Sequence, residues 1–317
     1  MSLKTTLTTL LKNHKAKIPI TCITAHDYLT GKLAATSPNI DMVLVGDSLA
    51  MTAQGFKSTV QLPFEVMQSS VEAVSRACPD KYLIADLTFG TFESSIGKCI
   101  ESSVSLMKNG AVDAIKIEGG YPLENHFKSM LSMGIPVVGH LGLQPQKVAM
   151  LGGYKVQGNT CKSAIDLYKE VRFLRDLGVK MLVLECVPSK VAQYITQDLD
   201  VISIGIGAGN GTSGQVLVVA DMLGMNEAAY EEGSQGAIPN YFDKSLLSCL
   251  PGAEIAKGQN RHIPKFVKLY ADFFKIGRAA VDLYGKEVKD GSFPSKEHGF
   301  VIKSEEWEKF LVEVKKV

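Results

Sequence analysis

The sequence predicts a (β/α)8 TIM barrel with C-terminal helices, and three observations support this fold class. Eight short apolar runs, rich in Val and Ile and without alternation, indicate strands that are buried on both faces, as in a parallel sheet. Segments with helical spacing separate the runs, and strand alternating with helix is typical of such barrels. The 317 residues are enough for one barrel of about 250 residues with additions.

Each predicted strand ends at Gly or at a residue able to carry charge. The eight runs span residues 19–27, 42–48, 82–87, 113–120, 135–143, 181–186, 201–210 and 215–221. An open doubly wound sheet is the main competitor, but its dinucleotide-binding form requires a Gly-rich turn after the first strand, where TAHDYLTGK offers none. Because active sites of these barrels lie at the carboxyl ends of the strands, the residues that end the runs are candidates for chemistry.

Helical spacing accounts for most of the remaining sequence. It predicts helices over residues 64–77, 93–110, 161–178, 265–291 and 304–316. The basic segment 1–17 also has helical spacing, which favours a short helix closing the bottom of the barrel over a transit peptide. We therefore expect a cytoplasmic location, or the mitochondrial matrix if this segment is a targeting signal.

The stretch 226–264 differs from the rest of the chain. It contains several Gly and Pro breaks and no strand-like run, so we expect a long irregular excursion after the eighth strand. No other boundary indicates a second domain. We therefore expect residues 1–317 to form one barrel domain with 226–264 as an insertion.

Composition narrows the possible partners. The formal net charge is +1 with no block of Lys or Arg, which gives no electrostatic reason to expect nucleic acid or an anionic membrane as a partner. No apolar stretch approaches the roughly 18 residues that span a bilayer. The six cysteines are scattered without a C-x-x-C pair, which favours free thiols in a reducing compartment over a zinc ribbon or a redox site.

Lys116 and Glu118 share one face of the fourth run, while Ile115 and Ile117 share the other. If the isoleucines pack under the outer helices, the two charged side chains face the barrel interior near its catalytic end. Ionised groups there are costly unless they are paired or bind something charged. We expect a functional role, and a buried ion pair at the barrel rim is the structural alternative.

Asp47 and Asp86 end the second and third runs, so adjacent strands bring their carboxylates within reach of one hard cation. Mg2+ is typically held by about one or two carboxylates, with waters and a substrate oxygen. Glu118 on the next strand adds a third acidic group, and crowded carboxylates require a cation or a bound proton among them. Each Asp could instead cap the helix or turn after its strand, and both interpretations stay open.

Two further strand ends carry groups suited to proton transfer. His140 ends the fifth run and is either a structural or a catalytic residue. Glu185 closes the sixth run after four apolar residues, so burial could make it a usable general base. Neighbouring backbone donors could equally hold Glu185 as a structural carboxylate.

Two Gly-rich segments have less specific interpretations. The G-x-G-x-x-G spacing occurs at Gly209, Gly211 and Gly214, but the third glycine leads into a strand where the dinucleotide fingerprint requires a helix. We therefore expect a loop packed closely against a ligand or another strand. Residues 152–158 form either a flexible segment at the mouth of the barrel or an ordinary surface turn.

Taken together, the strand ends resemble the ketopantoate hydroxymethyltransferase family of phosphoenolpyruvate/pyruvate-type barrels. The matching segments, in family order, are TAHDY, LVGDSLAM, the QG–ST turn at 54–59, IKIEGG, GHLGLQPQ, GGYKVQG, LVLECVP and IGIGAGN, with PKFVK further on. The segments TFGTFESS and NGTSGQVLV look more like fungal members of the family. A set of this length is specific, whereas no single piece would be.

The resemblance implies transfer of a hydroxymethyl group from 5,10-methylenetetrahydrofolate to 3-methyl-2-oxobutanoate, forming 2-dehydropantoate (ketopantoate) in pantothenate and coenzyme A biosynthesis. It implies a Mg-stabilised enolate and a homo-oligomer, often a decamer. Carried over by position, it implies Asp47 and Asp86 as metal ligands with Glu118 reached through water, a keto-acid site of Asp47, Ser48, Asp86 and Lys116, His140 in the substrate pocket, and Glu185 as the proton-transfer residue. Lys116 would help to stabilise the enolate oxygen.

Some residues depart from the family pattern. His26 stands where members usually have Tyr, and 226–264 is longer than the usual connection. One alternative is a folate-independent Mg2+-dependent C–C lyase of the same barrel type, which a test of folate dependence would separate. The other is a catalytically silent barrel kept for assembly, which would bind neither Mg2+ nor keto acid.

Overall fold

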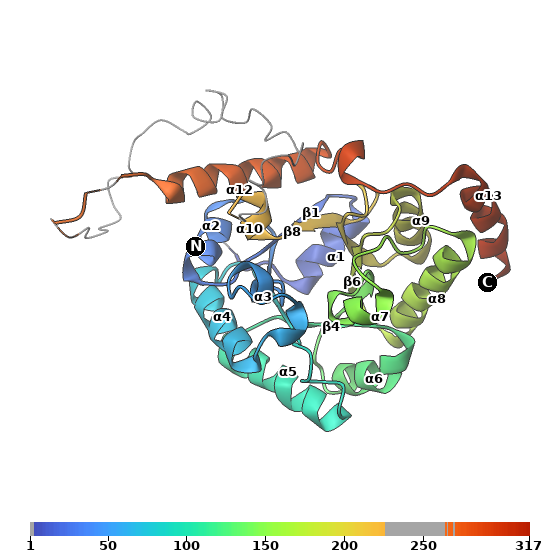
Figure 1. Ribbon diagram of the computed structural model, residues 1–317, viewed down its shortest axis with the longest axis horizontal. Coiled ribbons are helices and arrows are strands. Elements are labelled where there is room, and N and C mark those ends of the chain that lie inside the picture. Colours follow the sequence, from blue (N-terminus) through green and yellow to red (C-terminus); the bar gives the residue numbers. More distant parts are fainter. Residues whose placement is uncertain (1–2, 226–263, 265, 269) are drawn as a thin grey trace.

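The computed structural model describes residues 3–225, 264, 266–268 and 270–317, and its centre is a closed barrel of eight parallel strands (Figure 1). Each strand pairs with the next, and β8 pairs with β1 to close the barrel. The strands are β1 (Ile20–Thr24), β2 (Met42–Val45), β3 (Tyr82–Asp86), β4 (Ala114–Glu118), β5 (Val137–Gly142), β6 (Met181–Glu185), β7 (Ile202–Ile206) and β8 (Gly214–Leu217). The predicted fold class is confirmed, and every predicted run contains a strand.

Helices surround the strands (Figure 1). The described helices are α1 (Leu7–Lys15), α2 (Tyr28–Thr36), α3 (Leu49–Thr52), α4 (Phe64–Ala77), α5 (Ile96–Gly110), α6 (Glu124–Ser132), α7 (Val148–Leu151), α8 (Cys161–Leu177), α9 (Ser189–Leu199), α10 (Val219–Met222), α12 (Phe273–Asp290) and α13 (Ser304–Glu313). The last predicted run is a strand only as far as Leu217, because Val219 donates its N–H to Thr24 Oγ1 at 2.9 Å and begins α10. Similarly, α12 begins at Phe273 and not at residue 265 as predicted. The Asp272 side chain caps its start by accepting from Lys275 N.

Side chains alternate between the two faces of the barrel wall. Ile115 and Ile117 of β4 point outward into the large apolar cluster between the strands and the helices. Inward-pointing residues form a second apolar cluster that fills the lower barrel, including Ile20, Met42, Ile84, Val138, Val183 and Ile204. Lys116 and Glu118 are buried on the inner face, as the alternation predicts.

The amphipathic helix α1 closes the amino-terminal end of the barrel. Leu10 is fully buried in the inner apolar cluster, and Leu7 and Leu11 pack against it. The Thr6 side chain caps the helix by accepting from Thr9 N. The predicted closing helix is therefore confirmed, while the compartment stays a prediction. Among the described helices, none is long and apolar enough to cross a membrane.

The two C-terminal helices, α12 and α13, pack against the outside of the barrel. Helix α12 packs on α2 and β1, where Tyr284 Oη donates to Cys22 O at 2.9 Å and Asp282 Oδ1 accepts from Ser37 Oγ at 2.8 Å. Helix α13 packs on α8 with Phe310 fully buried. The insertion predicted at 226–264 lies, apart from Pro264, outside the described residues, so the predicted domain organisation stays a prediction.

Candidate active site

The predicted strand-end residues meet above the inner apolar cluster, at the carboxyl end of the barrel. Strand register brings them together, because Asp86 of β3 is the direct partner of Lys116 of β4, and Glu118 is the partner of His140 of β5. Glu185, the last residue of β6, completes the set one strand further on. The structure therefore places groups that are far apart in the sequence in one buried polar layer.

Lys116 and Asp86 form a buried ion pair with Nζ and Oδ1 3.0 Å apart. The other carboxylate oxygen, Asp86 Oδ2, accepts from Asp47 N at 3.0 Å. Burial lowers the pKa of Lys116, but the carboxylates of Asp86 and Glu118 outweigh burial and raise it, so the ammonium is charged. Burial is the largest influence on Asp86 and raises its pKa despite Lys116.

His140 joins the cationic and acidic groups. Its Nδ1 lies 3.0 Å from Lys116 Nζ and 3.4 Å from Glu118 Oε1, and its Nε2 lies 3.1 Å from Glu185 Oε2. Burial and Lys116 lower the pKa of His140, but Glu118 and Glu185 outweigh them and raise it to about 9. The raised pKa favours a protonated His140, whereas the contact with Lys116 requires a neutral ring. An ammonium can only donate, so Nδ1 must accept, and Nδ1 can accept only when the ring is neutral.

These two contacts of His140 Nδ1 exclude each other. The shorter one, to Lys116, favours the neutral tautomer in which Nδ1 accepts and Nε2 carries the proton, 3.1 Å from Glu185 Oε2. A protonated ring would have to give up Lys116 and donate Nδ1–H to Glu118 instead. Burial raises the pKa of Glu118, but a charged His140, then Lys116 and the Gln146 main-chain N–H, outweigh it and lower the pKa. With the ring neutral, Lys116 and the Gln146 N–H still favour the ionised carboxylate.

Asp47 lies beside the ion pair but has no cation of its own within the part of the chain that the structure describes. Burial, and then the carboxylates of Asp86 and Glu118, raise the pKa of Asp47 to about 8. Next to it, Ser48 is the N-cap residue of α3, but its hydroxyl accepts no capping hydrogen bond. A Cβ on Gly46 would lie 3.2 Å from Ser48 Oγ and 3.6 Å from Asp86 Oδ2, so the glycine keeps the space between these oxygens open.

This donor set fits Mg2+. Asp47 and Asp86 carry hard carboxylate oxygens on neighbouring strands. Burial raises the pKa of Asp47 most, and the neighbouring carboxylates raise it further, a repulsion that a cation would relieve. Among the described residues, no group of three or more His, Cys, Asp or Glu is arranged to hold a metal. Mg2+ typically keeps several waters and substrate oxygens, so two carboxylates can suffice as its protein ligands.

Gln146 is a further member of the polar layer that was not among the predicted site residues. This buried residue lies in the short 3-10 turn Pro145–Lys147 after β5, so it does not end a strand. Its Nε2 donates to Asp47 Oδ2 at 2.9 Å and to Leu87 O at 2.8 Å, and its main-chain N–H donates to Glu118 Oε2 at 3.0 Å. The segment GHLGLQPQ contains it, but only the barrel closure shows that it reaches β2 and β4.

Loops after β1, β2 and β5 border the polar layer. In the segment 152–158, Gln157 N donates to Cys186 O at 2.8 Å, and Tyr154 Oη contacts Met51 Sδ at 3.6 Å. The segment is therefore anchored at the barrel mouth and is not an isolated surface turn. His26 follows β1 with Nε2 3.9 Å from Asp27 Oδ2, and burial lowers its pKa despite that carboxylate.

The Gly-rich loop between β7 and β8 packs against protein and not around a phosphate. A Cβ on Gly209 would lie 2.3 Å from Ser189 Oγ, and one on Gly211 would lie 2.5 Å from Gln193 Cβ, both on α9. Gly214 begins β8, where a Cβ would lie 2.0 Å from Ile20 O of the neighbouring strand. The prediction of a closely packed loop is confirmed.

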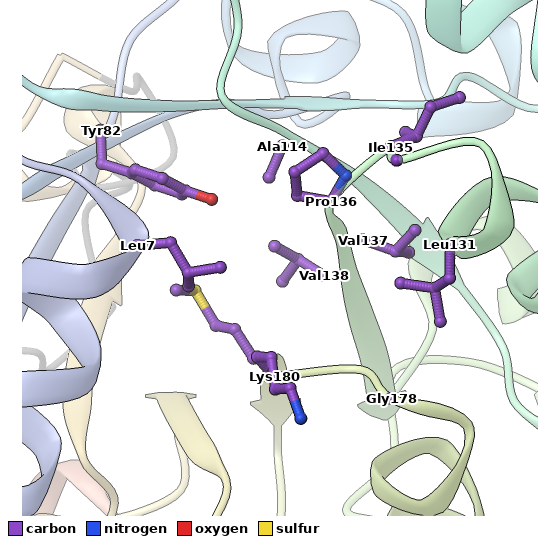
Figure 2. A pocket seen from close by; sticks show the side chains of 12 residues that line it. Leu7, Tyr82, Ala114, Leu131, Ile135, Pro136, Val137, Val138, Gly178 and Lys180 are labelled. Atoms are coloured by element: carbon purple, nitrogen blue, oxygen red, sulfur yellow. The ribbon is translucent and has the colours of Figure 1, made fainter.

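A cavity of about 220 Å³ lies at the opposite, amino-terminal end of the barrel (Figure 2). Leu7 of α1, Tyr82 of β3 and Val138 of β5 line it, together with Lys180 just before β6. The lining is mostly apolar and includes none of the strand-end residues described above. We therefore assign the chemistry to the polar layer and not to this cavity.

Comparison with known sequences points to one family. The family model for ketopantoate hydroxymethyltransferase matches residues 4–237. A 3-methyl-2-oxobutanoate hydroxymethyltransferase of Emericella nidulans is 36% identical over 97% of this chain and 79% of its own length. Another of that name, from Thermoanaerobacter sp., is 37% identical over 96% of this chain and 99% of its own length.

Comparison with solved structures bears on the fold alone. A putative phosphonomutase from Burkholderia cenocepacia has a TM-score of 0.55 at 13% identity, covering 69% of this chain and 94% of its own. A 2,3-dimethylmalate lyase of the PEP mutase/isocitrate lyase superfamily has a TM-score of 0.51 at 18% identity, covering 70% and 83%. These proteins share the barrel, and at such identity the likeness does not extend to the reaction.

Proposed function

The chain belongs to the ketopantoate hydroxymethyltransferase family and is an enzyme of pantothenate biosynthesis, and from this premise we propose how its residues perform the transfer. The acceptor is 3-methyl-2-oxobutanoate, and the one-carbon donor is 5,10-methylenetetrahydrofolate. The observation that carries the proposal is the continuous chain of contacts from Asp86 through Lys116 and His140 to Glu185. At one end of this chain, Lys116 supplies positive charge that can stabilise a developing oxyanion. At the other end, Glu185 supplies a carboxylate that can accept a proton.

The keto acid binds beside β2 and β3. The Ser48 hydroxyl, free of any cap, donates to the substrate, and the charged Lys116 ammonium faces the keto oxygen. Asp47 and Asp86 would hold Mg2+, with Glu118 reaching it through water. The chemistry that Mg2+ supplies when bound is positive charge beside the keto oxygen, which favours loss of the neighbouring C3 proton.

Glu185 takes that proton. Its side chain is 18% exposed, against 2% for Glu118, so it is the carboxylate that faces the open mouth. His140 Nε2 lies 3.1 Å from Glu185 Oε2 and faces the carboxylate that takes the proton. The C3–H electron pair forms the C2=C3 bond, and negative charge moves to the keto oxygen beside Lys116. Water adds to the methylene carbon of the folate, both of its C–N bonds break, and tetrahydrofolate leaves formaldehyde in the site. C3 then attacks the formaldehyde carbon, the C=O pair becomes the alkoxide, and the alkoxide takes the proton back from Glu185.

Isotope exchange tests the proton step without the folate donor. In D2O with Mg2+, the enzyme should exchange the C3 hydrogen of the keto acid, as proton NMR would report. Glu185→Gln should abolish the exchange and leave calorimetric Mg2+ binding intact. Glu170→Gln, in a partly buried carboxylate on α8 outside the polar layer, is the matched control and should exchange normally. Unchanged exchange in Glu185→Gln would remove Glu185 from this role.

The one-carbon donor needs its own assay. Product formation from keto acid, methylenetetrahydrofolate and Mg2+ should stop when the folate is omitted or a chelator is added. Activity that survives without folate would favour the C–C lyase alternative. The likeness to 2,3-dimethylmalate lyase concerns the fold alone and does not support that alternative.

On the family resemblance, we also propose that the chain forms a homo-oligomer, with a decamer as the candidate stoichiometry. Light scattering coupled to size-exclusion chromatography would give the mass of the particle. A mass equal to one chain of 34.3 kDa would contradict the assembly without bearing on the chemistry.

A further inference from the structure

Gln146 binds two acidic residues from different strands. Its side-chain amide holds Asp47 of the β2 end at 2.9 Å, and its main-chain N–H holds Glu118 of β4 at 3.0 Å. Gln146 comes from the turn after β5, so one residue ties together three loop and strand ends. Nothing in the proposed proton transfer uses it.

The orientation of the amide is set by a backbone group. Leu87 O can only accept, so the atom 2.8 Å away from it must be the NH2 group of Gln146 whatever the protonation state of Asp47. The second N–H then points at Asp47 Oδ2. The amide oxygen Oε1 is turned away from both and is buried without a hydrogen-bond partner among the described residues.

Local structure fixes where Gln146 stands. Pro145 opens the 3-10 turn and has no N–H, and the Gln146 N–H has no acceptor within so short a turn. Glu118 Oε2 accepts from it, so the carboxylate caps the turn. The same bond therefore fixes Glu118 and the start of the segment that carries the amide.

We propose that Gln146 is a positioning residue for the metal site: it holds one oxygen of Asp47 so that the other is presented to Mg2+. This positioning role rests on the proposed function, because it requires Asp47 to be a metal ligand. Ligand carboxylates are usually held by such outer hydrogen bonds, and losing one typically costs about 10–100-fold in metal affinity.

Gln215 provides a matched control. It is also a buried Gln whose Nε2 makes two hydrogen bonds, to Gly209 O at 3.0 Å and Thr212 Oγ1 at 2.8 Å. Both partners belong to the β7–β8 loop and neither is acidic. Gln146→Met and Gln215→Met therefore remove the same number of side-chain hydrogen bonds from buried sites, and only Gln146→Met removes one to a carboxyl group.

The experiment is a calorimetric titration of Mg2+ into the full chain with saturating 3-methyl-2-oxobutanoate and no folate, with melting temperatures recorded in chelator. Gln146→Met should bind Mg2+ about 10–100-fold more weakly than wild type, and Gln215→Met should bind it normally while losing similar thermal stability. Gln146→Asn, which keeps the amide but draws it back, should bind with intermediate affinity. It takes the place of Gln146→Met if that variant does not fold.

Two failures can be told apart. If wild type transfers hydroxymethyl and binds Mg2+ but both Gln146 variants bind it equally tightly, Gln146 is only structural and this inference falls. If wild type itself binds no Mg2+, the metal part of the proposed function falls and takes the inference with it.

Discussion

Asp47 donates its main-chain N–H to Asp86 Oδ2 at 3.0 Å, so two carboxylate residues on neighbouring strand ends are joined although only Asp86 is paired with a described cation, Lys116. The same functional group therefore stands in two electrostatic situations a few ångströms apart. One carboxylate is neutralised by the protein itself. The other is left for something that the protein binds.

Replacing each carboxylate by its amide should have opposite effects on the metal-free protein. Asp86→Asn leaves Lys116 buried without its partner and should cost about 3–5 kcal/mol. Asp47→Asn removes a carboxylate that burial and its neighbours disfavour, so it should raise the melting temperature. Thermal unfolding in chelator would measure both, and each variant should lack transferase activity.

The stabilisation by Asp47→Asn should depend on pH. Because the folded pKa of Asp47, about 8, lies above its unfolded value of 3.8, the folded state retains the proton longer than the unfolded state. The penalty is therefore absent below about pH 4, grows as pH rises, and levels off above about pH 8. A melting-temperature difference that is flat from pH 5 to pH 8 would contradict this assignment.

Mg2+ binding should release a proton below pH 8. The cation requires the ionised carboxylate, whereas the metal-free Asp47, with its pKa raised to about 8, holds its proton at neutral pH. The apparent affinity should rise by up to about tenfold per pH unit from pH 6 to 8 and then level off. Calorimetry in two buffers of different ionisation enthalpy would count the released protons.

His140→Asn should impair catalysis more than folding. The shorter side chain cannot span from Lys116 to Glu185, so the base loses its support and kcat should fall about 100-fold or more. His126→Asn is the control, because His126 is a partly buried residue of α6 that contacts Phe92 O away from the polar layer. Equal loss of activity in both variants would show a general effect on folding.

Asp282→Asn should weaken the attachment of α12 to the barrel. Burial raises the pKa of Asp282, but hydrogen bonds from Lys286 and then Ser37 outweigh it and lower the pKa. The stabilisation is therefore present above the unfolded pKa and is lost as pH falls through the lower folded value. We expect a loss of about 1–2 kcal/mol at pH 7 that disappears in strong acid, by urea unfolding.

Leu10→Ala should destabilise the barrel by weakening the packing of α1 against its amino-terminal end. Leu10 is fully buried in the inner apolar cluster, and truncating such a residue typically costs about 2–5 kcal/mol. Leu29→Ala, at an exposed position of α2, should change stability by less than about 0.5 kcal/mol. Equal effects of the two truncations, measured by urea unfolding, would mean that α1 does not close the barrel in solution.

The strand ends were predictable because parallel strands align their carboxyl ends at one edge. Alternation along β4 sufficed to place Lys116 and Glu118 inside, and both are there. The partners of each group were not predictable in the same way. That Lys116 pairs with Asp86, and His140 with both Lys116 and Glu185, depends on register and side-chain reach, which no single run contains.

Gln146 could not be predicted as a site residue from the sequence. A neutral amide in a turn carries no charge pattern, and its three partners come from residues 28, 59 and 99 positions away in the chain. Its role becomes visible only after the barrel closes. Two predicted element ends were also wrong: α12 begins later than predicted, and the last strand ends earlier. Periodicity alone extends an element, whereas a cap or a turn ends it.

The apolar filling of the lower barrel has a consequence for the polar layer above it. Ile84, Val138 and Val183 lie beneath Asp86, His140 and Glu185 on the same strands, so dissolved ions can approach the charged groups from the mouth alone. Screening by salt acts strongly on exposed charges and weakly on enclosed ones. Raising the ionic strength should therefore slow the entry of anionic substrate while leaving the chemical step, once the substrate is enclosed, nearly unchanged.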